Sequence, residues 1–543
     1  MNEARSLPQN PYPGAAVAFW RAACALRDAG PPPPWTPPEL AALMAFNAAA
    51  GAPTAVFAQL DRLGDSRALA VVAGQQAGLF VSPLYALYKA MAAVKWARRL
   101  EALLDRPVVP VFWIASEDHD FEEVRRAHYL DREGKAVSWT YIPPSYREGL
   151  SVYDIQIDSS QIAGFLRSIA EDTHPTEFKE ETLASWRKMG ETSPDLEVFF
   201  AKGLMTLLGG QGLVLASPRL APIRERAAPV LRREISHPGE STGLIAAAGR
   251  TMEAEGEKHP VHRRGDEANF FLYREGLRCK VTLDSGCFAV FPPGYAEPLE
   301  RLTQADLLRE LDKHPANFSP NVILRPIVQD HVLPVLAMVA GPGERDYLAM
   351  LDRAGVYPWF GVAPSRVLAR PRLLLVEPRI ERHLAKAGIP ESLLAEENWE
   401  AVAEAFIRST DHGAALDALD AWRLRLTEAF SVFSRQLGAL GRKPEVSSAL
   451  ARTAFAYMEA TDRLEKRLRD TLLTGQETVA SQKDRCMESL RPLGLPEERV
   501  LGPLAPFLVN YGGGVIPWIL EHMDLDARNL QVLHLSRIRD KET

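Results

Sequence analysis

One stretch constrains the fold of this 543-residue chain more than any other. An apolar run at residues 70–73 meets a glycine-containing turn at 74–80, and helix-forming residues fill 84–104. A second apolar run at 108–115 ends in a polar cluster at 116–120. A strand, a tight loop, a helix and a second strand in this order are typical of a βαβ unit with parallel strands. The pattern therefore predicts an α/β fold.

The turn after the first strand is a candidate ligand loop. Gly74 and Gly78 would let the backbone approach a ligand closely. The helix that follows has Ser82 as its expected N-cap and Pro83 as its first residue, and its amino end would favour an anion. The loop has neither the Gly-Lys-Ser/Thr of a P-loop nor a Gly-x-Gly-x-x-Gly dinucleotide motif. An ordinary strand-to-helix turn is the alternative interpretation.

A second strand end carries a similar pattern. Polar Arg325, Gln329 and Asp330 precede an expected strand at 333–339, which ends in the sequence GPGE at 341–344 before another helix. Burying such polar groups costs free energy, so they are paired or they bind a ligand. A structural ion pair between Arg325 and Asp330 is the alternative to a binding site.

Length, charge and cysteine content limit the class of protein. A chain of 543 residues suggests three to four structural units, and a net charge of −7 argues against nucleic-acid binding as the main activity. Four scattered cysteines without a Cys-x-x-Cys pair indicate free thiols in a reducing compartment. The first 14 residues lack the apolar core of a signal peptide and no apolar run approaches 20 residues, so we expect a cytoplasmic protein.

Further elements are expected between the two strand ends. Short strands are expected at 139–142, 151–157 and 213–216, and a β-hairpin at 270–282. His259 and His262 have the spacing of metal ligands, but no Glu or Cys partner is arranged around them, and no metal site is predicted.

After residue 375 the pattern becomes helical. Apolar residues follow a heptad with Arg423 as the exception, a break comes at 441–444, and a second heptad continues to 468. Two such helices predict an antiparallel coiled-coil hairpin that either dimerises or packs on its own core. Asn510, Tyr511 and Gly512 then begin a glycine-rich loop that suits a nucleotide or a turn. We expect three regions: a core at 1–374 with a helical lead-in, a helical arm at 375–500, and a segment at 501–543 that packs back on the core.

Several of these blocks resemble the bacillithiol biosynthesis cysteine-adding enzymes, the BshC family. The matching blocks are GQQAGLF at 74–80, PVFWIA at 110–115, EDHD at 117–120, QD at 329–330 and GPGE at 341–344. The resemblance implies a Rossmann-like parallel sheet with inserted connecting segments and a coiled-coil arm that forms a homodimer. It also implies ligation of L-cysteine to glucosaminyl-malate, with ATP activating the carboxylate by adenylation or phosphorylation, and with ATP or its product ADP bound. Mg²⁺ would be held by protein groups or only by the nucleotide phosphates.

The resemblance suggests a role for each candidate residue. His119, flanked by Asp118 and Asp120, is the candidate general base, and the neighbouring carboxylates would raise its pKa. Arg325 would offset charge on the activated carboxyl group. The remaining candidates are Gln75, Gln76, Gln329 and Asp330 for substrate, and Gly341, Gly343, Glu344, Asn510, Tyr511 and Gly512 for nucleotide. Another ATP-dependent ligase or nucleotidyl-transfer enzyme and a non-catalytic dimeric binding protein stay open as alternatives.

Overall fold

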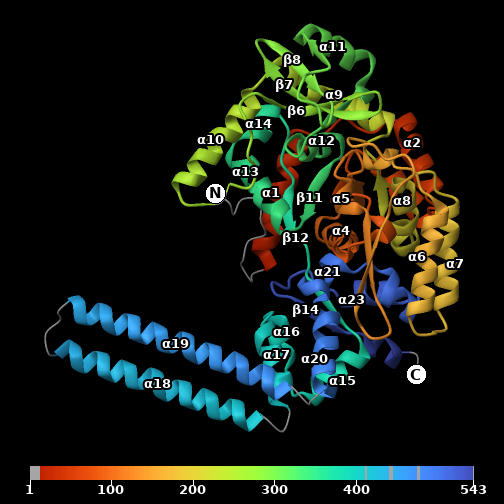
Figure 1. Cartoon of the computed structure of the whole chain (residues 1–543). Helices are drawn as coiled ribbons and strands as arrows, with labels where there is room; N and C mark the ends of the chain where they lie inside the picture. The colour runs from red at the N-terminus through yellow and green to blue at the C-terminus, as the bar shows by residue number, and fades with distance from the viewer. Residues whose placement is uncertain (1–12, 258, 410–412, 440–443, 474–476, 542–543) are drawn as a thin grey trace. The chain divides into compact units, whose positions relative to one another are not determined.

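The chain divides into two compact units (Figure 1). The computed structural model describes residues 13–257, 259–409, 413–439, 444–473 and 477–541. Unit 1 comprises the described residues through Arg132, Val137–Arg372 and Glu498–Arg528, and unit 2 comprises Glu133–Ala136, Leu373–Glu497 and the described residues from Asn529.

The carboxyl-terminal segment is shared between the units. Residues 501–543 were expected to pack back on the core. The structure instead groups the stretch after 528 with unit 2, because strand β14 (Gln531–His534) pairs in parallel with β13 (Leu373–Val376).

A five-stranded parallel sheet forms the centre of unit 1. Its spatial order is β12-β11-β1-β2-β5, which is 5-4-1-2-3 along the chain and matches the first five strands of the Rossmann order. This confirms the predicted α/β, Rossmann-like fold. The strands are β1 (Leu69–Gln75), β2 (Val108–Ile114), β5 (Val214–Ala216), β11 (Val335–Ala340) and β12 (Arg366–Ala369).

The strand order reverses between β1 and β11. In the register Ala73 lies beside Val339 on one side and Phe112 on the other, so these three strands end at nearly the same level. Ligands of open α/β sheets bind outside such a switch point, at the carboxyl ends of the strands. Residues that follow β1, β2 and β11 therefore share one edge.

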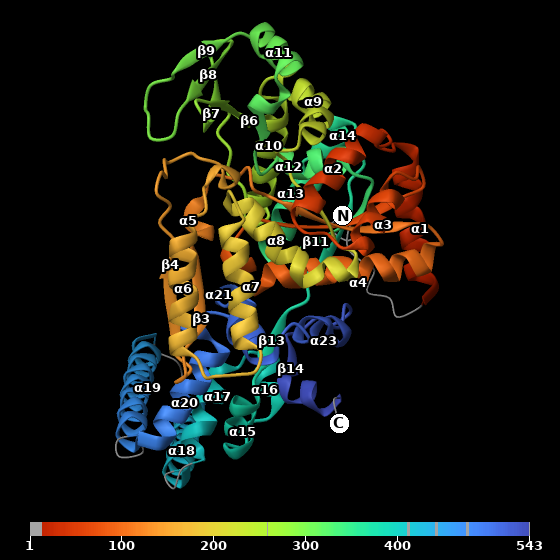
Figure 2. The same cartoon turned by 90° about the vertical axis from the view of Figure 1, so that its right-hand side faces the viewer.

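Helix α4 (Leu84–Leu104), labelled in Figure 2, has the predicted bounds. It packs along β1 and β2. Most of its residues are buried, which explains the apolar composition of its first half. Its N-cap position is Pro83, one residue later than expected, and Ser82 does not cap the helix with its side chain.

Gly74 and Gly78 are required by the protein's own packing. A Cβ atom at Gly78 would lie 1.9 Å from the Ser82 carbonyl oxygen, and one at Gly74 would lie 3.2 Å from that of Trp113. Contacts within the turn and between strands therefore account for both glycines, and the expectation that they let a ligand approach stays a prediction.

Replacing Gly78 by Ala is expected to lower the free energy of unfolding by about 2 kcal/mol, a typical cost of overpacking. The backbone of the turn must shift to make room for the methyl group. Urea denaturation would measure the change. Gly343→Ala is the matched control, because a Cβ there meets nothing within 4 Å, and it should cause no loss. Equal stability of the two variants would contradict the packing argument.

An antiparallel sheet completes the strands of unit 1. Its order is β10-β6-β7-β8-β9, with β6 and β7 as the predicted hairpin. The bounds are β6 (Glu267–Arg274), β7 (Leu277–Asp284), β8 (Cys287–Phe291), β9 (Glu300–Leu302) and β10 (Phe318–Pro320), with a separate pair β3 (Arg126–Leu130) and β4 (Ala136–Thr140). The strand expected at 151–157 is wrong, since this stretch holds a short 3₁₀ turn at Val152–Asp154 and a single isolated β-bridge from Gln156 to Asp195.

Helices surround both sheets of unit 1. In chain order they are α1 (Pro13–Ala29), α2 (Pro37–Ala49), α3 (Thr54–Leu63), α5 (Phe121–Val124), α6 (Ser159–Asp172), α7 (Lys179–Glu191), α8 (Leu196–Leu208), α9 (Ala221–Ser236), α10 (Glu240–Ala254), α11 (Gln304–Lys313), α12 (Leu324–Val332), α13 (Pro342–Arg353), α14 (Val356–Phe360), α22 (Val509–Tyr511) and α23 (Val515–His522). The short helix α21 (Glu497–Val500) lies at the junction of the two units in the sequence.

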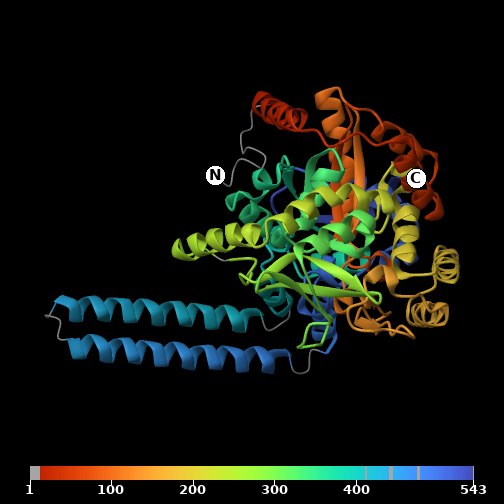
Figure 3. The same ribbon diagram turned by 90° about the horizontal axis from the view of Figure 1, so that it is seen from above.

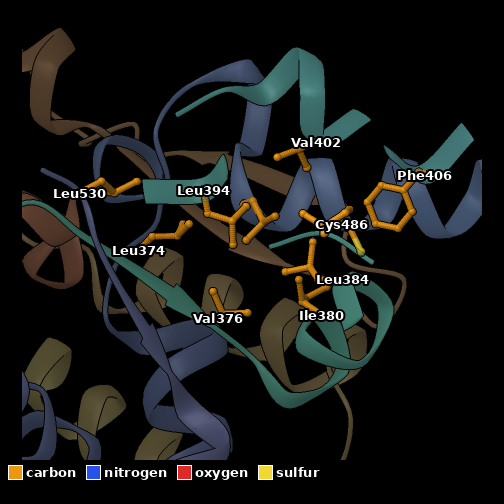
Figure 4. Close-up of a cluster of buried hydrophobic side chains, with 11 residues drawn as sticks. Leu374, Val376, Ile380, Leu384, Leu394, Val402, Phe406, Cys486 and Leu530 are labelled. Carbon is orange, nitrogen blue, oxygen red and sulfur yellow. The ribbon is translucent and has the colours of Figure 1, made fainter. Parts of the chain in front are cut away.

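Unit 2 has its own apolar core (Figure 4). It gathers side chains from the β13–β14 pair and from four helices, including buried Leu374, Val376, Phe406 and Cys486. The helices are α15 (Pro378–Lys386), α16 (Glu391–Ala395), α17 (Trp399–Arg408) and α20 (Glu477–Leu490). All four cysteines of the chain are unpaired, as predicted.

The predicted helical hairpin is formed by α18 (Gly413–Ala439) and α19 (Pro444–Leu473), which lie side by side (Figure 3). Arg423, the exception to the heptad, makes ion pairs of 3.0 Å to Asp462 and 2.8 Å to Glu465 on the facing helix. Phe430 and Tyr457 also meet across the seam. The break at 441–443 lies outside the described residues. Among those residues, no helix is both long and apolar enough to cross a bilayer.

Candidate active site

A cavity of about 560 Å³ opens at the switch point of the parallel sheet. Its walls come from the ends of β1, β2 and β11, from α4 and α13, and from the antiparallel sheet, all within unit 1. Of the predicted site residues, it brings together Gln75, Gln76, Asp118, His119, Arg325, Gly341, Gly343 and Glu344.

Lys89 and Glu344 form a buried ion pair at the bottom of this site. The Lys89 ammonium group donates to Glu344, to the Gly74 carbonyl oxygen at 3.1 Å and to Gln75 Oε1 at 2.9 Å. Only 4% of the Lys89 side chain is exposed. Burial lowers the pKa of Lys89, and Glu344 opposes that shift. The pair therefore links α4, the β1 loop and α13 through one cation.

Glu344 also caps its own helix. It accepts the Gly341 N–H at 2.9 Å, and the Arg325 guanidinium lies 3.8 Å away. Burial alone would raise the pKa of Glu344, but the cations Lys89 and Arg325 lower it below its usual range. The carboxylate is thus held ionised.

Arg325 comes from α12 and is 15% exposed. It donates to the Tyr347 hydroxyl, so its partners are Tyr347 and Glu344. Burial raises the pKa of Tyr347, which keeps that hydroxyl protonated and polar. Arg325 therefore faces the cavity as a fixed cation rather than as the partner of Asp330.

The two glutamines of the β1 loop differ in their surroundings. Gln75 donates to the Tyr85 hydroxyl at 3.2 Å and accepts from Lys89. Gln76 is 6% exposed, and its Oε1 has no hydrogen-bond partner among the described residues. A buried acceptor left unpaired costs about 1–3 kcal/mol, which a ligand donor at the cavity wall would offset.

His119 follows β2 and is held by Arg278 from β7. The Arg278 Nη1 lies 3.1 Å from His119 Nδ1, and Asp118 Oδ1 lies 3.7 Å from the same nitrogen. A guanidinium can only donate, so Nδ1 accepts and a neutral ring carries its proton on Nε2. The tautomer is therefore set by Arg278.

The pKa of His119 departs from the sequence-based expectation. Burial lowers this pKa first, the Arg278 cation lowers it further, and the opposing effects of Asp118 and Asp120 are smaller. The predicted upward shift is therefore wrong, because it counted only the neighbouring carboxylates in the sequence. His119 stays neutral to a lower pH than an exposed histidine.

Several site residues escaped the sequence analysis, and three of them are Lys89, Arg278 and Glu117. Lys89 was hidden among the apolar residues of α4, and Arg278 lies 159 residues from His119 in a hairpin with no motif of its own. Glu117 lies inside the polar cluster, is buried, and pairs with Arg224 at 3.0 Å. Only Glu117 had a sequence signal, namely its place at the end of β2.

The remaining residues predicted after β2 and in α12 lie away from the cavity. Asp120 is exposed at the N-cap position of α5. Gln329 is fully buried, with its amide 3.6 Å from the Met338 sulfur, and Asp330 accepts the Ser365 N–H at 2.8 Å. None of these side chains lines the cavity. The face of α12 that carries Gln329 and Asp330 is turned to the protein interior, which assigns them a structural role here.

Asn510, Tyr511 and Gly512 also lie outside the cavity lining. Gly512 has a φ of 65°, and a Cβ there would lie 2.7 Å from the Phe178 ring. The glycine-rich loop is thus packed closely next to α7. Of the two alternatives given for it, a nucleotide site or a turn, this packing favours the turn.

A second cavity of about 550 Å³ adjoins the first. It shares His119, Phe271 and Arg278 with the first cavity and extends over the antiparallel sheet to Tyr295. The Arg278 guanidinium lies 3.9 Å from the Phe271 ring centroid, between the two spaces. Together they can accommodate a ligand with two separate parts.

The histidine pair has a carboxylate partner after all. Glu253, at the end of α10, places Oε1 3.5 Å from His259 Nδ1. The expectation that no Glu accompanies His259 and His262 is therefore wrong, because the turn after α10 brings the loop back along the helix.

Comparison with known proteins identifies the family. Residues 39–371 match the model of the bacillithiol biosynthesis BshC N-terminal Rossmann-like domain, and residues 373–535 match that of its C-terminal coiled-coil domain. A relative from Salinibacter ruber, named "Putative cysteine ligase BshC", is 30% identical over 87% of this chain and 84% of its own length. Relatives of the same name from Chlorobaculum tepidum and Bacillus velezensis are 32% and 28% identical, each over 84% of this chain and over 81% and 83% of their own lengths. The chain therefore belongs to the BshC family of bacillithiol biosynthesis, whose relatives are named as ligases.

Proposed function

We propose that this chain forms the amide bond between L-cysteine and the amino group of glucosaminyl-malate, with nucleotide-dependent activation of the cysteine carboxylate. The observation that carries the proposal is the cavity at the β1/β11 switch point, where cations, a neutral histidine and the amino end of α13 converge. The identity of the substrates is inferred from the family, and the side chains that line the cavity are suited to bind them.

The charges of the cavity suit anionic substrates. Six cations line it, namely Lys89, Arg263, Arg278, Arg325, Arg370 and Arg499, against four carboxylates, Glu117, Asp118, Glu123 and Glu344. Glucosaminyl-malate carries two carboxylates, and a cysteine carboxylate and a nucleotide add further negative charge. A surplus of positive charge in a concave site attracts such ligands and raises their local concentration.

The residues also fit a nucleotide. Gly341 and Gly343 line the cavity at the amino end of α13, where Glu344 accepts the Gly341 N–H and the Gly343 N–H is the group suited to a phosphate. Arg499 is exposed there and has no hydrogen-bond or ion-pair partner among the described residues. ATP, when bound with Mg²⁺, supplies the activation that makes a carboxylate reactive toward an amine. Arg325 would then stabilise negative charge on the cysteine carboxyl group.

His119 would take the proton of the attacking amine. Its Nδ1 lone pair is engaged by Arg278, so proton acceptance requires Arg278 to turn away. A substrate carboxylate is a stronger partner for a guanidinium than an imidazole is, since the hydrogen bond is charge-assisted on both sides. Substrate binding would thus release the base.

The reducing cytoplasm suits both the thiol substrate and the unpaired cysteines of the chain.

Mass spectrometry tests the reaction directly. Purified full-length protein is incubated with glucosaminyl-malate, L-cysteine, ATP and Mg²⁺, and we expect a product of the mass of bacillithiol that is absent without ATP. Release of AMP or of ADP would distinguish adenylation from phosphorylation. Failure with cysteine but turnover with another amino acid would overturn the substrate assignment, and ligand binding without any turnover would favour a binding protein.

We infer that the α18–α19 hairpin forms a homodimer. Several of its large apolar side chains stay exposed in a single chain, among them Phe455 at 67% and Met458 at 58%. The two-helix seam leaves these side chains in water, and a contiguous exposed apolar surface is typical of an interface.

Replacing Phe455 and Met458 together by Glu is expected to convert the dimer to a monomer. Two buried carboxylates per chain would be costly to desolvate at such an interface. Size-exclusion chromatography with light scattering would measure the mass. Leu299→Glu, an exposed apolar position of unit 1, is the matched control and should leave the mass unchanged. A dimer that survives the double change would place the interface elsewhere.

A further inference from the structure

Two imidazole rings lie in contact outside the cavity. His259 and His262 follow α10, and their ring centroids are 4.2 Å apart. Glu253 lies on the last turn of α10, 3.5 Å from His259. One ligand atom of each of the three residues lies within 4.8 Å of the others.

The His259 ring is largely buried without hydrogen bonds. Neither ring nitrogen has a hydrogen-bond partner among the described residues, and the side chain is 11% exposed. A neutral imidazole has one donor and one acceptor, and leaving each unpaired costs about 1–3 kcal/mol. No hydrogen bond in the described fold offsets this cost. A bound cation would use one of the two nitrogens.

We propose that Glu253, His259 and His262 bind one divalent transition-metal ion of the zinc class. Two imidazole nitrogens and one carboxylate oxygen are ligands that zinc accepts at three of its positions, with water at the fourth. Magnesium and calcium prefer sites made of oxygen, so the donor set disfavours them.

The geometry needs only a small closure. Two ligands of one zinc ion can be at most about 4.2 Å apart, twice a zinc–nitrogen bond length. Glu253 and His262 are both exposed, so their side chains can rotate onto the ion while the more buried His259 stays in place.

The ion would fix a loop that reaches the cavity. Arg263, the residue after His262, lines the cavity and donates to the Ala268 carbonyl oxygen at 2.7 Å. Metal binding would anchor the backbone next to this cation. The metal site itself does not depend on the ligase assignment, since its ligands lie outside the cavity.

Titration calorimetry of chelator-treated, full-length protein with ZnCl₂ tests the proposal. We expect one ion per chain, and at least a tenfold weaker affinity in His262→Gln and in Glu253→Gln, because even indirect partners of a metal site are worth about 10–100-fold. Both side chains are exposed, so neither change should unfold the protein. His174→Gln, an exposed histidine elsewhere in unit 1, is the control and should bind like the wild type.

Hydrogen exchange provides a second readout. Zinc should slow exchange of the backbone amides at 255–266 in the wild type and not in His262→Gln. No binding by the wild type, unchanged binding in His262→Gln, or binding abolished only by blocking the thiols would each overturn the proposal.

Discussion

Replacing Lys89 by Met is expected to lower the free energy of unfolding by about 3 kcal/mol and to abolish ligation. Methionine is unbranched like lysine and only slightly shorter, but the change leaves the Glu344 carboxylate without its closest cation. Removing one partner of a buried ion pair costs about 3–5 kcal/mol, and Arg325, 3.8 Å from Glu344, keeps the loss near the lower end. Urea denaturation would measure the stability, and the mass-spectrometric assay the activity.

The double variant Lys89→Met/Glu344→Gln separates charge from packing. It removes both charges, and the amide oxygen of the introduced glutamine can still accept the Gly341 N–H. We expect it to recover at least about 1 kcal/mol of the loss, a typical coupling for groups in contact, without recovering activity. Arg99→Met on the same helix is the control. Arg99 pairs with Asp526 at the surface, and such pairs contribute about 0–1 kcal/mol. A double variant no more stable than Lys89→Met would contradict the ion-pair argument.

The parts of the fold that could be predicted are those with a strong local pattern. The bounds of α4 and the approximate positions of β1, β2 and β11 follow from apolar runs closed by glycine or, for β2, by a polar cluster, and the α18–α19 hairpin follows from its heptads. The short segment at 151–157 has apolar residues at strand-like spacing, but it pairs only through one β-bridge at Gln156 and turns as a 3₁₀ helix at Val152–Asp154. Contacts with residues that are distant in the sequence determine the secondary structure of such short segments, and no local sequence pattern reveals those contacts.

The candidate site was predictable where it follows strand ends. Gln75, Asp118 and Glu344 share one cavity because the three strands that precede them end at the same level. Gln329 and Asp330 were expected there because of their charge and polarity, yet their face of α12 points inward. Arg278 could not be found, since it joins the site through a sheet that is distant in sequence.

Arg278→Gln is expected to lower kcat/KM for ligation by about 100-fold or more. It should also move the acid limb of the pH profile of kcat/KM to higher pH. The guanidinium is buried and donates to the Ser319 hydroxyl at 2.8 Å, the Pro320 carbonyl oxygen at 2.7 Å and His119 Nδ1 at 3.1 Å. Glutamine is too short to keep these contacts and has no charge with which to bind a substrate carboxylate, and loss of one preorganised donor to a reacting site costs about 10²–10³ in rate.

The direction of the pH shift follows from the charge of Arg278. A cation beside His119 disfavours the imidazolium, so the native pKa of His119 is lowered, first by burial and then by Arg278. Without Arg278 this pKa rises partway toward its ordinary value, and a base that must be neutral is protonated at a higher pH. The profile of kcat/KM reports groups of the free enzyme, in which Arg278 and His119 are in contact.

Two further measurements make the Arg278 prediction specific. Titration of His119 by NMR should show the same upward movement of its pKa in Arg278→Gln without any turnover. Arg301→Gln removes an arginine of the same antiparallel sheet that pairs with Asp284 at 3.0 Å, and it should leave both the rate and the titration unchanged. A slow Arg278→Gln enzyme whose acid limb coincides with that of the wild type would limit Arg278 to substrate binding, and it would remove the support that this contact gives to His119 as the base.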